Sequence, residues 1–199
     1  MTIGIDPGLA NTGVCVLDGG KPVEFETITT KPADGDVTRR IDLIAQRLAR
    51  VMCEHKPDVV AIEAPYVGTW KRGKELASTA SNAMHLAEIV RQLSVIASKF
   101  GSEVVMVKPI DGFRALTGSG SGNKARHVQM ANLLMPPHLP KLRKTQNHLA
   151  DALGVAWRGE QKYRLEKSEL HKGGLFRIPP VDTTGGVDPA DYVAEMREG

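Results

Sequence analysis

Residues 2–20, TIGIDPGLANTGVCVLDGG, decide which class of fold this chain adopts. Residues 2–5 are a short run rich in β-branched side chains, and a turn-forming Asp-Pro-Gly follows them directly. A second run of this kind covers residues 12–17, and an Asp-Gly-Gly turn joins it to a third at residues 23–28. Because short connections make neighbouring strands antiparallel, we expect the chain to open with three antiparallel strands.

Further along the chain, helical patterns alternate with strand patterns. Apolar residues three and four positions apart predict helices over residues 36–55 and 74–100. Short apolar strands are expected at residues 59–62 and 104–107, each beside one of these helices. Strands that are separated by helices pair in parallel through crossovers. The sequence therefore predicts an α/β fold with a mixed five-stranded sheet and helices on both of its faces.

The last part of the chain divides into a folded end and a less regular extension. A glycine- and serine-rich loop at residues 118–122 precedes helices predicted at residues 123–135 and 145–157. The apolar periodicity is lost after that point. We therefore expect one domain over residues 1–157 and a C-terminal extension, partly disordered and of unknown role, over residues 158–199.

The composition limits the class of protein. About 41% of the 199 residues are apolar, which is enough for a single core, and no apolar run approaches the ~20 residues of a membrane-spanning helix. The first residues lack the pattern of a signal peptide. Two isolated cysteines, Cys15 and Cys53, fit neither a zinc site nor a disulfide framework. A reduced, cytoplasmic protein without membrane contact is the expectation.

Basic residues are concentrated in one segment, although the net charge of the chain is only +3. Residues 108–145 hold seven Lys or Arg and one Asp, a local charge of +6, so the rest of the chain sums to −3. A local excess of this size can hold phosphate groups without the whole protein being basic. A solvated surface remains the alternative for this segment.

Four side chains form a candidate metal site. Asp6 and Glu63 each follow an apolar strand directly, and His148 and Asp151 lie three residues apart on the last predicted helix. Residues just past strand ends often form the site of an open α/β sheet. Carboxylates that are packed closely repel one another unless a cation joins them, and Mg²⁺ or Mn²⁺ suits such ligands. Two such ions about 3.5–4 Å apart catalyse phosphodiester hydrolysis in many nucleases.

Each of these residues alone also fits a plain structural role. Asp6 belongs to a good turn sequence, and His148 with Asp151 fits an exposed helix face. Glu63 is the more unusual residue, because glutamate is rare beside a buried strand. The order of the four, with their flanking residues, is more specific than any one of them.

Four segments carry a family resemblance: GIDPGLANTG, AIEAPYV, TGSGSGNKARHVQMANLL and HLADALGVAW. In sequence and order, over about residues 2–157, they resemble the RuvC family of Holliday-junction resolvases. The resemblance implies an RNase H-like fold, a homodimer, two Mg²⁺ or Mn²⁺ ions per active site, and symmetrical nicks in four-way DNA junctions that leave 5′-phosphate and 3′-hydroxyl ends. It places Asp6, Glu63 and Asp151 on the metal-binding carboxylates, and His148 where the family has Asp or His.

The imidazole at position 148 bears on the choice of metal. Histidine is a softer ligand than aspartate, so we expect Mn²⁺ to support cleavage better than Mg²⁺ does. Equal cleavage across a titration of both ions would contradict this expectation.

The glycine loop is not a Walker A motif, because Asn123 and Ala125 flank its lysine. From the residues alone, a flexible linker is an equally good interpretation. The resemblance matches Lys124 to a lysine that contacts the scissile phosphate region. Arg114 is the nearest candidate for a further basic residue before the loop, and Arg126 adds charge toward the DNA backbone.

A second basic segment follows the second predicted active-site strand. Tyr66 matches a position where the family often has an aromatic that stacks on an unpaired base, although a tyrosine packed at the rim of the core is the alternative. Lys71 and Arg72 come shortly after it and are further candidates for DNA contact.

The helix at residues 74–100 is rich in Ala and Ser. From the residues alone, a core helix is favoured over a dimer contact. The resemblance implies that this helix forms a two-fold interface, which suits two symmetry-related cuts.

Other functions remain open at this point. A related RNase H-like nuclease of the YqgF type, acting on structured RNA or on another branched DNA, has the same acidic residues. Sugar kinases, actin and Hsp70-like ATPases share the first loop but need two such halves, well over the length of this chain. A binding-only protein with decayed catalysis is disfavoured by four intact ligands.

Overall fold

The structure is a computed structural model that describes residues 1–65, 75–120 and 123–172. The side chains of residues 75–81 and 169–172 lie outside this description. Within the described ranges, none of the helices combines the length and the apolar composition that crossing a lipid bilayer requires. The two cysteines are free, and Cys15 is buried.

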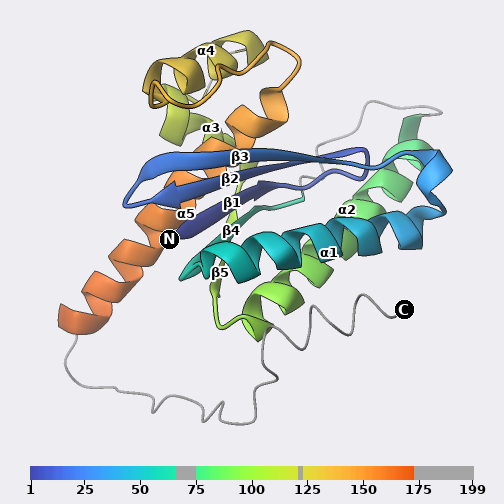
Figure 1. The fold of residues 1–199 in the computed structure, drawn as a ribbon, viewed down its shortest axis with the longest axis horizontal. Helices are drawn as coiled ribbons and strands as arrows, with labels where there is room; N and C mark the ends of the chain where they lie inside the picture. The colour runs from blue at the N-terminus through green and yellow to red at the C-terminus, as the bar shows by residue number, and fades with distance from the viewer. Residues whose placement is uncertain (66–74, 121–122, 173–199) are drawn as a thin grey trace.

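Five strands form one mixed sheet in the order β3-β2-β1-β4-β5 (Figure 1). Strands β1, β2 and β3 pair antiparallel, whereas β1 pairs with β4, and β4 with β5, in parallel. The bounds are β1 Thr2–Asp6, β2 Asn11–Asp18, β3 Lys21–Thr29, β4 Val59–Glu63 and β5 Glu103–Val107. This arrangement confirms the predicted mixed sheet, because tight turns joined the first strands and helical crossovers joined the later ones.

Helices cover both faces of the sheet, as predicted (Figure 1). One core lies between the sheet and the helices α1 and α2, and includes Ile5, Leu48 and Leu93. A second core lies on the other face, where α4 and α5 pack against β2. The helices are α1 Val37–His55, α2 Glu75–Lys99, α3 Pro109–Thr117, α4 Lys124–Leu134 and α5 Asn147–Lys172, with a short 3-10 helix η1 at Pro32–Asp34.

Helix α5 lies in direct contact with the sheet because glycines face it. A Cβ atom added at Gly4 on β1 would lie 2.3 Å from the backbone oxygen of Ala152. A Cβ added at Gly13 on β2 would lie 2.3 Å from the backbone oxygen of His148. Real Cβ atoms do not approach backbone so closely, so glycine is required at both places. These contacts set the height of the first turns of α5 above the sheet.

The predicted end of the last helix at Trp157 was wrong, because α5 continues to Lys172. Gly159 packs against Ala61, and Tyr163 packs on a small apolar cluster of β4 and β5, so the helix still contacts the sheet after residue 157. An ion pair between Glu160 and Arg164 at 2.6 Å spans one turn of this part of the helix. Residues 164–168 are exposed and consist mostly of polar helix formers. The prediction relied on apolar residues three and four positions apart. Exposed helical turns lack this pattern, so the predicted helix ended too early.

Candidate active site

Two acidic residues lie side by side at the ends of adjacent parallel strands. Ile5 on β1 pairs with Ile62 on β4, so the last residues of the two strands, Asp6 and Glu63, lie at the same edge of the sheet. Their carboxyl groups lie close enough to hydrogen-bond to one another when one of them is protonated. The register of two buried strands therefore places this pair.

The first turn of α5 adds Asp151 and His148 to the same edge. Gly13 is the register partner of Asp6, and it also contacts the backbone of His148, so α5 begins directly above the end of β1. Asp151 interacts electrostatically with both Asp6 and Glu63. The imidazole of His148 is turned toward β3, where its Nε2 lies 2.8 Å from Oγ1 of Thr27.

The acidic pair is poorly neutralised by the protein. Burial, then the charges of Glu63 and Asp151, raise the pKa of Asp6 from 3.8 to about 9. Burial and the charge of Asp151 raise the pKa of Glu63 from 4.5 to about 7. Burial lowers the pKa of His148. Asp6 and Glu63, held beside Asp151 in this way, disfavour their own ionised forms, and an added cation would relieve that repulsion.

These shifts predict that the metal-free protein loses stability as pH rises. The folded chain binds more protons than the unfolded chain between pH 4 and 9, so the slope of the unfolding free energy with pH is negative there. The contribution of these two groups to the unfolding free energy is fully present below their ordinary pKa values. It is lost as the pH rises through about 7 for Glu63 and about 9 for Asp6. Urea unfolding at pH 5 and pH 9 should differ by about 2–4 kcal/mol. Added Mn²⁺ should reduce the difference, and a flat profile without metal would contradict this account.

Lys124 is the cation that faces the acidic pair. It lowers the pKa values of Asp6 and Glu63 and also that of His148. With the amide of Asn147 oriented so that its oxygen faces Lys124, the ammonium nitrogen lies 3.2 Å from that oxygen. Lys124 is the first residue of α4, where Asn123 caps the helix by accepting from the backbone N–H of Arg126 at 2.9 Å. The capped end of α4 thus holds a positive charge beside three carboxyl groups.

A fifth side chain, His127 on α4, belongs to the site and was not predicted. It is 1% exposed, and its Nδ1 lies 2.6 Å from Oδ1 of Asp151. Phe113 on α3 packs against the ring with 4.5 Å between ring centroids. A histidine within an amphipathic helix gives no sequence signal of this kind, because its partner lies 24 residues away on another helix.

The donor set suits a hard divalent cation, although its side chains are not arranged around a single point. Within residues 1–65, 75–120 and 123–172, no three His, Cys, Asp or Glu side chains are placed as ligands around one point. Asp6 and Glu63 point to each other, and Asp151 points to His127. A bound cation would take the place of a proton on this pair, and the crowded carboxylates supply the oxygen ligands that Mg²⁺ and Mn²⁺ take. The chemistry therefore fits a cation, which would reorient these side chains.

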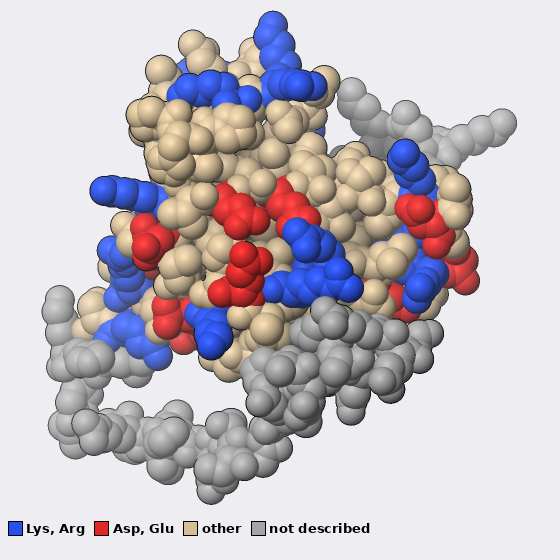
Figure 2. All heavy atoms as spheres, in the orientation of Figure 1, with Lys and Arg blue, Asp and Glu red and all other residues tan. Residues whose placement is uncertain are grey.

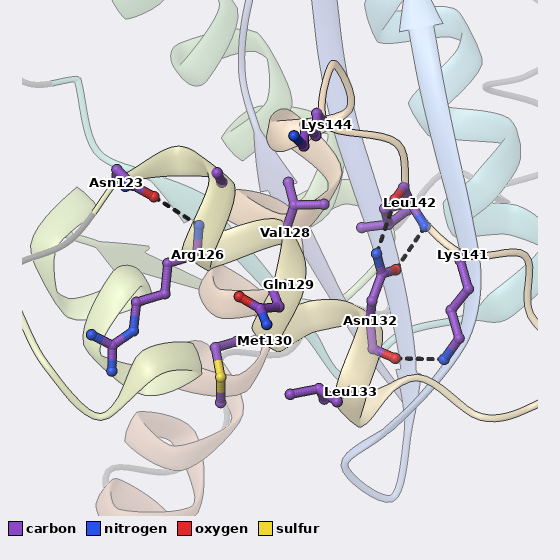
Figure 3. Close-up of a pocket in the computed structure, with 11 residues that line it drawn as sticks. Asn123, Arg126, Val128, Gln129, Met130, Asn132, Leu133, Lys141, Leu142 and Lys144 are labelled. Carbon is purple, nitrogen blue, oxygen red and sulfur yellow. Dashed lines mark hydrogen bonds between the residues drawn. The ribbon is translucent and has the colours of Figure 1, made fainter.

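Only some of the residues predicted to bind DNA lie in the described part of the chain. Arg114 lies over the glycine loop, because a Cβ added at Gly120 would meet its Nε at 2.6 Å. Arg126 is exposed at one end of a groove between α4 and the following loop, with Lys141 at the other end (Figure 3). Lys and Arg side chains gather at the α4 end of the molecule (Figure 2). The remaining predicted residues, Tyr66, Lys71 and Arg72, lie outside the described residues.

Comparison with known proteins identifies relatives over most of the chain. The crossover junction endodeoxyribonuclease RuvC of Streptomyces coelicolor is 28% identical over 183 residues, which cover 89% of this chain and 93% of that protein. RuvC of Rhodococcus opacus is 29% identical over 173 residues, covering 84% and 86%. Both relatives are matched over nearly their whole length.

Solved structures show the same fold. T. thermophilus RuvC in complex with Holliday junction substrate superposes with a TM-score of 0.63 and 26% identity, covering 83% of this chain and 95% of that chain. A yeast mitochondrial Holliday junction resolvase is alike in fold, with a TM-score of 0.53 and 14% identity over 87% of this chain and 84% of that one. The family model for crossover junction endodeoxyribonuclease RuvC matches residues 2–158. This chain belongs to the RuvC family, and its sheet and helices are those of an RNase H-like fold.

Proposed function

We propose that this protein is an endonuclease that resolves four-way DNA junctions by metal-dependent hydrolysis of two symmetry-related phosphodiester bonds. The observation that carries the proposal is the meeting of Asp6, Glu63 and Asp151 at one edge of the sheet, with Lys124 beside them. Relatives of similar length that are named for this activity, and a relative solved with a Holliday junction, support it.

In this proposal, the acidic residues hold two Mg²⁺ or Mn²⁺ ions. Asp6, Glu63 and Asp151 supply oxygen ligands, and His148 supplies an imidazole once its ring leaves Thr27. When bound, the ions supply the positive charge that activates water and stabilises the leaving oxygen in phosphodiester hydrolysis. Asp6 lies between Glu63 and Asp151 in its interactions, which makes it the residue best placed to serve both ions.

Basic side chains around this edge orient the DNA. Lys124 is exposed and close to the acidic pair, so it can pair with the phosphate that is cut. Arg114 and Arg126 lie on α3 and α4 beside it and add contacts to the backbone. Tyr66, Lys71 and Arg72 are proposed from the sequence alone to contact unpaired bases and phosphates near the crossover.

Two copies of the chain are proposed to act together through α2. Met84 is 72% exposed and Val95 is 44% exposed. The two residues are eleven positions apart, about three helical turns, so they lie on the same outward face of the helix. The ion pair between Glu88 and Arg91 lies between them on the same face, and a face that combines apolar and charged groups suits a two-fold contact, which would present two active sites to two strands of one junction.

The test is a cleavage assay on three labelled substrates: a synthetic four-way junction, a linear duplex and an RNA hairpin. The proposal expects paired nicks in the junction only with a divalent cation, ligatable ends, and Mn²⁺ more effective than Mg²⁺. Preferred cleavage of the RNA hairpin would replace the junction by structured RNA as the substrate. Cleavage of all three substrates at equal rates would contradict selectivity for branched DNA.

A further inference from the structure

The ring of His127 is held in an environment that a structural role alone does not account for. Helix α3 approaches α5 closely, because a Cβ added at Gly154 would lie 2.4 Å from the backbone oxygen of Gly112. This close packing carries Phe113 against one face of the His127 ring. The imidazole is therefore fixed between Phe113 and the carboxyl group of Asp151.

The polar atoms of this buried ring are not satisfied as they lie. Nδ1 is 2.6 Å from Oδ1 of Asp151 but outside hydrogen-bond geometry, and Nε2 has no hydrogen-bond partner among the described residues. Unsatisfied buried nitrogens destabilise a fold, and an apolar side chain of similar size would fit a site that is otherwise built from apolar residues such as Val128 and Ala131. A histidine here lowers the stability of the fold, so its presence calls for a functional reason.

The contact with Asp151 supplies such a reason. A carboxylate that ligates a metal needs its second oxygen held, or it rotates and loses ligand geometry. Nδ1 of His127 already lies 2.6 Å from Oδ1, so a small rotation of either side chain would aim its N–H at that oxygen and leave Oδ2 for a cation. The amide of Asn147, turned with its oxygen toward Lys124, does not donate to Asp151.

We propose that His127 is a positioning residue that orients the Asp151 carboxylate for divalent-cation binding through its Nδ1–H. The inference rests on the proposed function, in that Asp151 acts as a metal ligand. It assigns to α4 a role in building the metal site in addition to the role of Lys124. The ring contacts neither substrate nor cation, and acts only through Asp151.

Two variants distinguish the nitrogen that matters. His127→Asn places an amide N–H near the position of Nδ1, whereas His127→Gln places one near Nε2, away from Asp151. Calorimetric titration of the DNA-free protein with Mn²⁺ should show binding about 10–100-fold weaker for His127→Gln and for the apolar His127→Leu. His127→Asn should recover most of this loss and remain less than about tenfold weaker than wild type. Equal Mn²⁺ affinity in all four proteins would overturn the assignment.

A matched control separates positioning from stability. Val128→Ala, at the neighbouring buried position on α4, should lower the melting temperature without moving the Mn²⁺ affinity. His127→Leu should do the reverse, with a melting temperature at or above wild type and weakened Mn²⁺ binding. If His127→Leu does not fold, the comparison of Asn with Gln still decides, and equal binding by those two would reject the role of Nδ1.

Failure of the inference is distinguishable from failure of the proposed function. A wild-type protein that neither binds Mn²⁺ nor cuts a junction rejects the proposed function. A wild-type protein that does both, beside a His127→Leu variant of unchanged Mn²⁺ affinity, rejects only the role of His127.

Discussion

Asp6→Asn should abolish junction cleavage and, at pH 8 without metal, raise the melting temperature by about 4–8 °C. The first effect follows because Asp6 is the carboxylate that interacts with both Glu63 and Asp151, so the proposed cation site loses its central ligand. The second follows because burial and the neighbouring acids oppose ionisation of Asp6. An amide of the same shape removes that opposition, and a gain of about 2 kcal/mol in the free energy of unfolding corresponds to the expected rise in melting temperature for a domain of this size.

The measurement pairs a cleavage assay with thermal melting, and adds a junction-binding assay. Binding should be retained, because the basic side chains that orient the DNA are untouched. Asp18→Asn is the matched control, since Asp18 is an exposed aspartate at the end of β2. It changes the net charge equally and should alter neither cleavage nor melting. Residual cleavage by Asp6→Asn, or a lowered melting temperature, would contradict the account of the site.

Gly13→Ala should destabilise the fold and reduce cleavage out of proportion to the loss of stability. The added Cβ would lie 2.3 Å from the backbone oxygen of His148 and 2.7 Å from its carbonyl carbon. Because the backbone atoms of His148 cannot move aside on their own, the whole first turn of α5 must move away from the sheet. This should lower the free energy of unfolding by about 1–3 kcal/mol. The melting temperature should fall by about 2–12 °C. Asp151 would move away from Asp6 and Glu63, and a displacement of about 1 Å costs about 100-fold in rate.

Ile44→Val is the control for stability alone. Ile44 is fully buried on α1, on the opposite face of the sheet, and its truncation costs about 0.5–1.5 kcal/mol. Rates measured at a temperature where both variants remain folded should fall only for Gly13→Ala. Equal rates in the two variants would show that the seat of α5 on Gly13 does not set the geometry of the site.

The sheet was predictable because its determinants are local. The Asp-Gly-Gly turn after β2 fixed an antiparallel hairpin, and the helix between β1–β3 and β4 required a crossover. The end of α5 was not found, because the turns after Trp157 contact the sheet mainly through Gly159 and Tyr163 and otherwise carry polar helix formers, such as the paired Glu160 and Arg164. Counting residues of high helix propensity, in addition to the spacing of apolar residues, would have indicated that the helix continues.

The candidate site was predictable in its membership more than in its geometry. Strand ends marked Asp6 and Glu63, and helical spacing linked His148 to Asp151. The direction of the His148 ring depends on Thr27, 121 residues earlier in the chain, and no local pattern reports such a contact. His127 was missed for the same reason, since its meaning depends on Asp151 and on Phe113 from a third helix.

The length of α5 has a mechanical consequence. Its 26 residues form a rod of about 39 Å, seated on Gly4 and Gly13 near one end and extending past the sheet at the other. Close-packed interiors transmit strain instead of absorbing it. Asp151 lies between the contacts that His148 and Ala152 make with Gly13 and Gly4, so the position of its carboxylate is set by how the whole rod rests on the sheet.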